Sequence, residues 1–297
     1  MNGRQLPANA AITPEHRWAL TLRVGRWWRG FGTGLCFVVY ACVGWLAGVT
    51  LLPLVSLCSG SGEQRQQRVR RLVSWSFRAL LATIAGLRLG HVEVQGRQWL
   101  RQAEGKLLVA NHPMYLDVVA LVGLLPLADC VVKQAMWRNR LYRRFVKVLG
   151  YIGNADSVGL LHDCVDSLRS GRTLILFPEG TRSTPGEPLH FERGAAQVAV
   201  RSGCDILPVV IRCRPLVLGK HQAWHEVSDR PWVLELNICP PCSPAELGVT
   251  VDMPRAVAAR RVNRALQALF VQQLGSGDAV PGCTGDGGVT GRAQEAT

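Results

Sequence analysis

Two short apolar runs, each followed by a polar turn, most constrain the fold of this chain. Residues 107–110 (LLVA) precede the turn NHPMYLD at 111–117, and residues 173–177 (TLILF) run into the turn FPEGTRS at 177–183. Short apolar runs bounded by turn residues are typical of buried strands. Buried strands that end in polar turns predict an α/β fold, in which ligands bind in the crevice beyond the strand ends.

The first turn contains a histidine and an aspartate, His112 and Asp117. Residues 116–125 predict a helix, and Pro113 suits a first helical turn because its missing N–H costs nothing there. Asp117 would then lie about one turn into the helix, where its carboxylate can reach back to one ring nitrogen of His112. The other nitrogen would be left as a proton acceptor, as in a general base. His221 and Glu226 have almost the same spacing without other catalytic signs, so this pair alone also fits a solvated turn.

The second turn distinguishes between these two interpretations. Together, the two turns resemble motifs of the glycerolipid acyltransferase family, of the lysophosphatidate acyltransferase type. Residues 191–195 (FERGA) resemble that family's turn into a helix, and residues 206–209 (ILPV) resemble its last motif, so the matches lie in order across roughly 87–240. The resemblance implies a mixed sheet flanked by helices, and transfer of a fatty acyl chain from an acyl thioester to a glycerolipid hydroxyl.

The resemblance also implies roles for the residues of the two turns. His112 would be the base and Asp117 its orienting carboxylate, while Glu179 and Arg182 would contact the acceptor and its phosphate. The other expected substrate-binding residues are Asn111, Gly180 and Thr181. The acceptor would be a lysophospholipid, with 1-acyl-glycerol-3-phosphate as the first choice, and the donor would be acyl-coenzyme A or an acyl–acyl carrier protein. We expect neither a cofactor nor a metal.

One motif of the family is not matched. The resemblance predicts an aromatic-x-Arg tripeptide near Gly150, but the chain reads YIGN at 151–154. Arginine offers a bidentate fork to phosphate that asparagine cannot copy. The alternative acceptor is therefore another lysolipid that lacks this phosphate, such as a lyso-aminolipid. A catalytically silent lipid-binding relative is a further alternative, against which the complete His112–Asp117 pair argues.

The N-terminal part of the chain predicts membrane association. Residues 31–57 carry no charge, and the segment is long enough to cross a bilayer. Arginines flank both of its sides, which suits a segment that dips into one leaflet and returns, broken at Pro53 and at Gly44 or Gly48. Residues 64–85 form an amphipathic pattern with arginines outside the apolar stripe. Such a helix can lie on anionic lipid or pack its apolar face on the catalytic domain.

We therefore predict four regions: a basic segment at 1–30, membrane-embedded and amphipathic helices at 31–85, an acyltransferase domain at 86–274, and a disordered tail at 275–297. Within the domain, residues 87–94, 130–133 and 232–238 predict strands. Residues 136–149, 158–168, 194–201 and 254–274 predict helices. The protein is expected at the cytoplasmic membrane with its catalytic domain facing the cytosol, where scattered cysteines stay reduced.

Other classes of protein fit the chain less well. The net charge of +13 comes mostly from arginine and suits acidic partners such as anionic lipid. The clearest basic clusters flank an apolar anchor rather than forming a nucleic-acid-binding module, so nucleic acid is not an expected partner. A serine hydrolase would need a Gly-x-Ser-x-Gly elbow, which the sequence lacks, so direct transfer without a covalent intermediate is favoured.

Overall fold

A mixed seven-stranded sheet forms the centre of the molecule, with the strand order β1-β7-β6-β2-β5-β3-β4. The computed structural model describes residues 14–58, 62–133, 140–154, 157–184, 186–223 and 225–275. Neighbouring strands are parallel except for the antiparallel pair β6–β7. The strands are β1 (Gly90–Gln95), β2 (Leu107–Ala110), β3 (Asp129–Lys133), β4 (Ile152–Asn154), β5 (Leu174–Leu176), β6 (Ile206–Arg214) and β7 (Trp232–Ile238).

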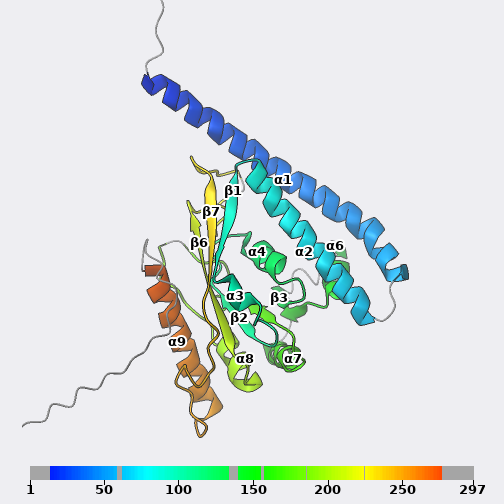
Figure 1. Ribbon diagram of the computed structural model, residues 1–297, viewed down its shortest axis with the longest axis vertical. Helices are drawn as coiled ribbons and strands as arrows, with labels where there is room; N and C mark the ends of the chain where they lie inside the picture. Colours follow the sequence, from blue (N-terminus) through cyan, green and yellow to red (C-terminus); the bar gives the residue numbers. More distant parts are fainter. Residues whose placement is uncertain are drawn as a thin grey trace, which may run out of the picture.

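Helices cover both faces of this sheet, as Figure 1 shows with α9 on one side and α1, α2 and α4 on the other. The helices are α1 (Pro14–Cys58), α2 (Gly62–Gly86), α3 (Arg97–Leu100), α4 (Asp117–Leu124), α6 (Arg140–Leu149), α7 (Ser157–Arg169), α8 (Gly194–Ser202) and α9 (Arg255–Gly275). Strand β2 explains the two layers, because all four of its residues are buried. Leu108 and Ala110 pack in the cluster that includes α4, whereas Leu107 and Val109 pack in the cluster that includes α7, α8 and α9. Such two-sided burial is expected of a central parallel strand.

The structure differs from the sequence-based expectation in the N-terminal region. Helix α1 is one continuous helix through Gly44, Gly48 and Pro53, so the predicted break is wrong. A proline removes only one backbone hydrogen bond, and long apolar helices tolerate this loss. The helix also begins at Pro14, so most of the expected basic segment is helical. The predicted strand at 87–94 begins only at Gly90, because Leu87, Arg88 and Leu89 form the turn that ends α2.

Other boundaries shift in smaller ways. Helix α4 begins at Asp117, so Pro113 lies in the turn before it and Asp117 is its first residue rather than a residue one turn inside. The start of the helix predicted at 136–149 and the tail at 276–297 lie outside the described residues. The division of the chain into four regions stays a prediction.

The apolar face of α2 packs on the catalytic domain, as one of the two interpretations of its amphipathic pattern predicted. Ile84 is buried in the core, and Phe77, Leu80 and Leu81 pack against the same cluster. Helix α1 runs beside α2 (Figure 1), where Tyr40 Oη lies 3.3 Å from Ser76 Oγ.

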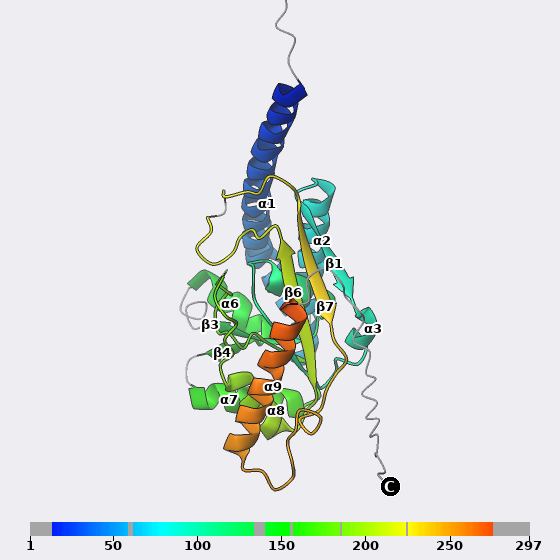
Figure 2. The same cartoon turned by 90° about the vertical axis from the view of Figure 1, so that its left-hand side faces the viewer.

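Helix α1 also contacts the loop between β6 and β7, residues 215–231. Figure 2 shows this loop beside α1. Arg29 Nε donates to the Ser228 carbonyl at 2.9 Å, and Arg26 pairs with Asp229. The N-terminal helix is therefore tied to a loop that follows the central part of the sheet.

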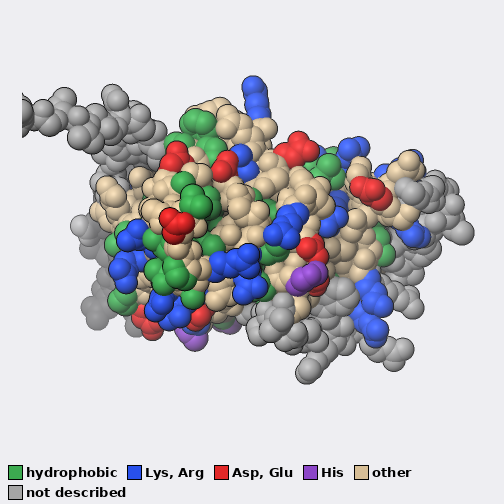
Figure 3. All heavy atoms as spheres, turned by 90° about the horizontal axis from the view of Figure 1, so that it is seen from below, with side chains coloured by type: hydrophobic (Ala, Val, Ile, Leu, Met, Phe, Trp, Pro, Cys, Tyr) green, Lys and Arg blue, Asp and Glu red, His purple; other side chains and the backbone are tan. Residues whose placement is uncertain are grey.

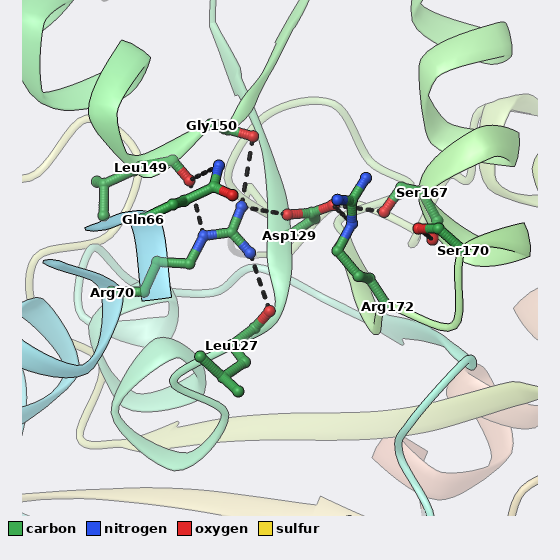
Figure 4. Close-up of polar contacts among 9 residues, drawn as sticks. All are labelled: Gln66, Arg70, Leu127, Asp129, Leu149, Gly150, Ser167, Ser170 and Arg172. Atoms are coloured by element: carbon green, nitrogen blue, oxygen red, sulfur yellow. Dashed lines mark hydrogen bonds and ion pairs between the residues drawn. The ribbon is translucent and has the colours of Figure 1, made fainter. Parts of the chain in front are cut away.

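A buried ion-pair cluster fastens α2 to the edge of the sheet where β3 begins (Figure 4). Arg70 is only 4% exposed and pairs with Asp129, the first residue of β3. Its guanidinium also donates to the carbonyls of Leu149 at 2.7 Å and Leu127 at 3.0 Å. On the other side of Asp129, Arg172 Nε lies 3.0 Å from Oδ2. The buried charges are thus paired and hydrogen-bonded, as burial requires.

Positive charge is spread over the surface rather than gathered in one place on the face seen from below. Figure 3 shows lysines and arginines on that face interspersed with acidic, hydrophobic and other side chains. An interspersed pattern differs from the basic stripe typical of a nucleic-acid-binding face.

Candidate active site

His112 lies just beyond the carboxyl end of β2, at the edge of the sheet opposite to the Arg70–Asp129 cluster. Its Nδ1 is 3.0 Å from Asp117 Oδ2, and its ring packs on Phe177 with a centroid distance of 4.5 Å. The side chain remains 17% exposed. Nε2 has no hydrogen-bond partner within the described part of the chain. A neutral ring held in this way donates Nδ1–H to the carboxylate and presents the Nε2 lone pair as a base.

Asp117 is fully buried and lies at the N-terminus of α4. Its Oδ2 accepts a second hydrogen bond from the Met114 N–H at 2.8 Å, whereas Oδ1 has no partner among the residues described. Burial raises the pKa of Asp117 from its ordinary value of 3.8 to about 6, and the hydrogen bonds from His112 and Met114 oppose that rise. The positive end of the helix dipole also favours the ionised form. Asp117 is therefore ionised near neutral pH and holds the His112 ring.

A second His–Asp pair shows that distance alone does not define this site. On α7, His162 Nδ1 lies 3.0 Å from Asp166 Oδ2, but the two side chains are 76% and 56% exposed. Exposed pairs of this kind contribute little to the stability of the fold, because water screens the attraction between the two side chains. What distinguishes His112 is a buried carboxylate beside a partly accessible ring.

Glu179 connects the second turn to the first. Its Oε1 accepts hydrogen bonds from the His112 backbone N–H at 2.9 Å and from Ser183 Oγ at 2.8 Å. The Ser183 N–H in turn donates to the His112 carbonyl at 2.8 Å. Burial raises the pKa of Glu179, while these hydrogen bonds and the charges of His112 and Lys220 oppose the rise. Through Oε1, Glu179 positions His112; a contact with the acceptor would fall to its other oxygen and stays a prediction.

Arg182 is held by the loop that follows β6. Its Nη1 donates to the carbonyls of Leu218 at 3.0 Å and Gly219 at 2.9 Å, and its guanidinium carbon lies 5.9 Å from the centroid of the Tyr115 ring. A structural role for Arg182, in place of phosphate binding, would be an ion pair with a nearby acid such as Glu187 or Asp156. Within the described residues Arg182 forms no ion pair with Glu187, and Asp156 lies outside them. Nε and Nη2 of Arg182 have no partner in this part of the structure.

The other three residues expected to bind substrate differ in their surroundings. The Asn111 side chain is 3% exposed, and both ends of its amide are used by Ile211, whose N–H and carbonyl lie at 2.7 and 2.8 Å. Both ends of the Asn111 amide therefore bind strand β6, and a substrate contact by Asn111 stays a prediction. Gly180 adopts a positive φ of 64°, which favours glycine at this turn. Thr181 is exposed beside it. Substrate contacts by Gly180 and Thr181 stay predictions.

Sequence reasoning missed two residues that the structure brings to the site. Tyr115 lies between Arg182 and Phe37 of α1. The ring centroids of Tyr115 and Phe37 are 6.5 Å apart. Lys220 Nζ donates to Thr184 Oγ1 at 3.1 Å and lies close enough to Glu179 to lower the pKa of that carboxyl. The available signals were the place of Tyr115 within the first turn and the rarity of lysine in an arginine-rich chain. No group of His, Cys, Asp and Glu able to hold a metal ion occurs in the residues described.

Comparison with known proteins points to one family. Residues 91–212 match the model of a family described as Acyltransferase. The matched segment runs from β1 into β6 and includes both turns of the site. The resemblance inferred from the two turns is therefore confirmed.

Similar proteins carry one activity in their names. A chloroplastic 1-acyl-sn-glycerol-3-phosphate acyltransferase of Brassica napus is 23% identical over 221 residues, which cover 71% of this chain and 59% of that protein. The 1-acyl-sn-glycerol-3-phosphate acyltransferase alpha of Mus musculus is 24% identical over 262 residues, which cover 82% of this chain and 85% of that protein.

The fold has a counterpart among solved structures. The 1-acyl-sn-glycerophosphate (LPA) acyltransferase PlsC of Thermotoga maritima superposes with a TM-score of 0.61 at 21% identity, covering 81% of this chain and 97% of that one. The predicted mixed sheet flanked by helices is confirmed.

Proposed function

We propose that this protein transfers a fatty acyl chain from an acyl thioester to the free hydroxyl of a lysophospholipid, with 1-acyl-glycerol-3-phosphate as the acceptor. The observation that carries the proposal is the buried carboxylate of Asp117, 3.0 Å from His112 Nδ1, behind a ring that remains accessible. The names of the similar proteins support the choice of acceptor.

The dyad has the groups that direct acyl transfer requires. His112 Nε2 takes the hydroxyl proton while the acceptor oxygen attacks the thioester carbonyl, and the ionised Asp117 stabilises the resulting imidazolium. A C–O bond forms, the C–S bond breaks, and the imidazolium gives its proton to the leaving thiolate. Glu179 keeps the His112 backbone in place during these steps through its 2.9 Å hydrogen bond.

Arg182 supports binding of the acceptor phosphate. Only its Nη1 is used by loop carbonyls, so Nε and Nη2 remain to form a fork for phosphate oxygens within the described structure. We assign the donor to acyl-coenzyme A or acyl–acyl carrier protein. Two exposed basic residues of α6, Arg143 and Lys147, suit the phosphates of coenzyme A or an acidic surface of the acyl carrier protein.

The protein acts at a membrane in this proposal, through α1. Residues 25–46 of this helix are long and apolar enough to cross a membrane. Large apolar side chains exposed on the helix include Trp27, Phe31, Val38, Val39, Val43, Trp45 and Leu46. Because another side of α1 packs on α2 and reaches Tyr115 through Phe37, we place the helix along the lipid of one leaflet, next to the active site. The membrane is the cytoplasmic membrane, with the domain on its cytosolic side.

An acceptor panel tests this function. The full-length protein in detergent is assayed with oleoyl-coenzyme A and oleoyl–acyl carrier protein against glycerol 3-phosphate, lysophosphatidate, other lysophospholipids and lyso-aminolipids. We expect thioester consumption only when an acceptor is present, and the highest kcat/KM with lysophosphatidate. No consumption with any lysolipid would identify a silent lipid-binding relative, and preference for an acceptor without phosphate would overturn the assignment of the acceptor.

A further inference from the structure

The loop between β6 and β7 brings a lysine to the active-site turns. Lys220 Nζ donates to Thr184 Oγ1 at 3.1 Å, while Arg182 Nη1 donates to the carbonyls of Leu218 and Gly219. The two loops therefore hold each other through one cation from each. This arrangement places Lys220 and Arg182 in the same group of contacts as Glu179 and the His112 backbone.

The backbone around Lys220 is held in an uncommon conformation. Leu218 and His221 adopt positive φ values of 52° and 71°, which residues other than glycine rarely do. Such strain persists where surrounding contacts over-determine it, and it concentrates at functional sites. Here Arg182 binds two loop carbonyls, and the Gln222 side chain accepts the Gly219 N–H at 2.9 Å. The loop thus presents Lys220 from a fixed backbone.

The charge balance of this group favours an anionic ligand. Lys220 and Arg182 are both partly buried, and the carboxylate near them, Glu179, already accepts two hydrogen bonds at Oε1. An ammonium has three N–H donors, of which Thr184 uses one. Nε and Nη2 of Arg182 are also left over in the described structure. Two cations with spare donors beside one carboxylate match the charge and the several acceptor oxygens of a phosphate monoester.

The topology puts these two cations on either side of the catalytic turn. Strand β2, which leads to His112, lies between β6, which leads to Lys220, and β5, which leads to Arg182. Asn154, at the position where the family's motif near Gly150 would supply an arginine, ends β4 at the far edge of the sheet. Asn154 itself supplies no cation, although Lys133 of β3 lies in register with it, whereas Lys220 supplies a cation on the β6 side of the site.

We infer that Lys220 binds the phosphate of the acyl acceptor together with Arg182, in place of the arginine absent at Asn154. This inference rests on the proposed function and names a specificity residue for it. Lys220 binds the phosphate group in both ground and transition states, so its loss raises the KM for a phosphorylated acceptor with a smaller effect on kcat.

Steady-state kinetics of the full-length protein in detergent test the inference, with lysophosphatidate and oleoyl-coenzyme A as probes. Lys220→Met should raise the KM for lysophosphatidate about tenfold or more, the usual effect of losing a hydrogen bond to a charged group. The KM for oleoyl-coenzyme A should change by less than about twofold. Lys220→Arg should restore much of the loss. The matched control is Lys106→Met, because Lys106 pairs with Asp205 at 2.8 Å just before β2, at the end of that strand away from His112.

Two further measurements separate phosphate binding from a structural role. Thr184→Val removes the hydrogen bond to Lys220 but leaves its charge, so it should raise the KM for lysophosphatidate less than Lys220→Met does. The preference for lysophosphatidate over monoacylglycerol, which lacks the phosphate, should fall in Lys220→Met. Equal effects of Thr184→Val and Lys220→Met, or equal losses for both substrates with a lower Tm, would overturn the inference while the proposed function stands. A wild-type protein that does not acylate lysophosphatidate would overturn both.

Discussion

Glu179 accepts a hydrogen bond from the backbone N–H of His112 at 2.9 Å, so the acid of one turn fixes the base of the other. The reverse contact, from the Ser183 N–H to the His112 carbonyl at 2.8 Å, closes the connection. The backbone of His112 is thus held from both its N–H and its carbonyl by a turn that follows a neighbouring strand. This geometry makes Glu179 a positioning residue for His112.

Glu179→Ala should therefore lower kcat more than it raises the KM for the acceptor. It should also lower the free energy of unfolding by about 1–3 kcal/mol, since the partly buried His112 N–H loses its acceptor. Steady-state kinetics and chemical denaturation measure both effects. Glu187→Ala, which changes an exposed acid in the same segment, is the control. A pure rise in KM for the acceptor would instead indicate that Glu179 acts by binding substrate.

His112→Ala should reduce kcat by about 10²- to 10⁴-fold, the usual contribution of a general base. The chain provides its own control in His162→Ala, because that residue makes a His–Asp pair of the same 3.0 Å distance on the exposed surface of α7. The control should keep nearly full activity. Comparable activity of both variants, in folded protein, would refute the proposed mechanism.

The activity should depend on pH through Asp117, whose pKa burial raises to about 6. Below this pH the carboxyl group becomes protonated and no longer stabilises a charged His112, so kcat/KM should fall by up to tenfold per pH unit. Asp117→Asn should have low activity and lack this step. A pH–rate profile from about pH 4.5 to 8 measures the effect.

Asp117 should also make the free energy of unfolding depend on pH, but with the opposite sign: activity rises with pH through this group, whereas stability falls. Because the folded pKa of about 6 exceeds the ordinary 3.8, the folded protein binds more protons than the unfolded chain between these values. The contribution of Asp117 to the free energy of unfolding should therefore decrease as the pH rises from about 4 to about 6. The free energy of unfolding, measured by denaturation of wild type and Asp117→Asn across this range, should therefore change with pH by different slopes in the two proteins. Equal slopes would contradict the raised pKa of Asp117.

The apolar runs and the turns after them located the two turns of the candidate site, but they did not predict the contacts that join these turns. The buried strands that end just before Asn111 and Phe177 could be located because their residues are apolar and the turns that follow are polar. The contact of Glu179 with the His112 backbone could not be predicted, because it joins residues that only the strand order brings together. Lys220 was missed for the same reason: its loop follows β6, and no local pattern marks a lysine that reaches across to Thr184.

The N-terminal region shows the opposite limitation. The uncharged run at 31–57 predicted an apolar segment correctly, but Pro53 and the glycines suggested a break that α1 does not have. Local preferences for breaking a helix are weaker than the continuous hydrogen bonding of a long apolar helix. One of the two interpretations of the amphipathic pattern of α2 predicted its packing on the domain, but neither indicated that Arg70 would be buried against Asp129.

Arg70→Ala should destabilise the protein strongly, by about 3 kcal/mol in the free energy of unfolding, because it removes a buried partner of Asp129. Arg172→Ala is the matched control, since Arg172 contacts the other oxygen of Asp129 from a half-exposed position. Its cost should be about 1 kcal/mol or less. Thermal or chemical denaturation of the two variants gives the comparison. Equal costs would show that the burial of Arg70 does not determine its contribution.

Membrane binding should depend on the exposed face of α1. Val38 and Val43 are 61% and 55% exposed on this helix, and Val271 on α9, across the sheet, is 52% exposed. Replacing an apolar residue in lipid by aspartate costs about 3 kcal/mol at the centre of a bilayer and less near its surface. The double variant Val38→Asp/Val43→Asp should therefore bind vesicles of anionic and zwitterionic phospholipids at least about tenfold more weakly than wild type. Val271→Asp should bind as wild type does.

Co-sedimentation with vesicles at low and high salt measures this binding. The residual binding of the double variant should weaken at high salt, because it depends on arginine–lipid attraction. Equal binding by all three proteins would remove α1 from the membrane contact and would leave the active site without the lipid surface that the proposed acceptor requires.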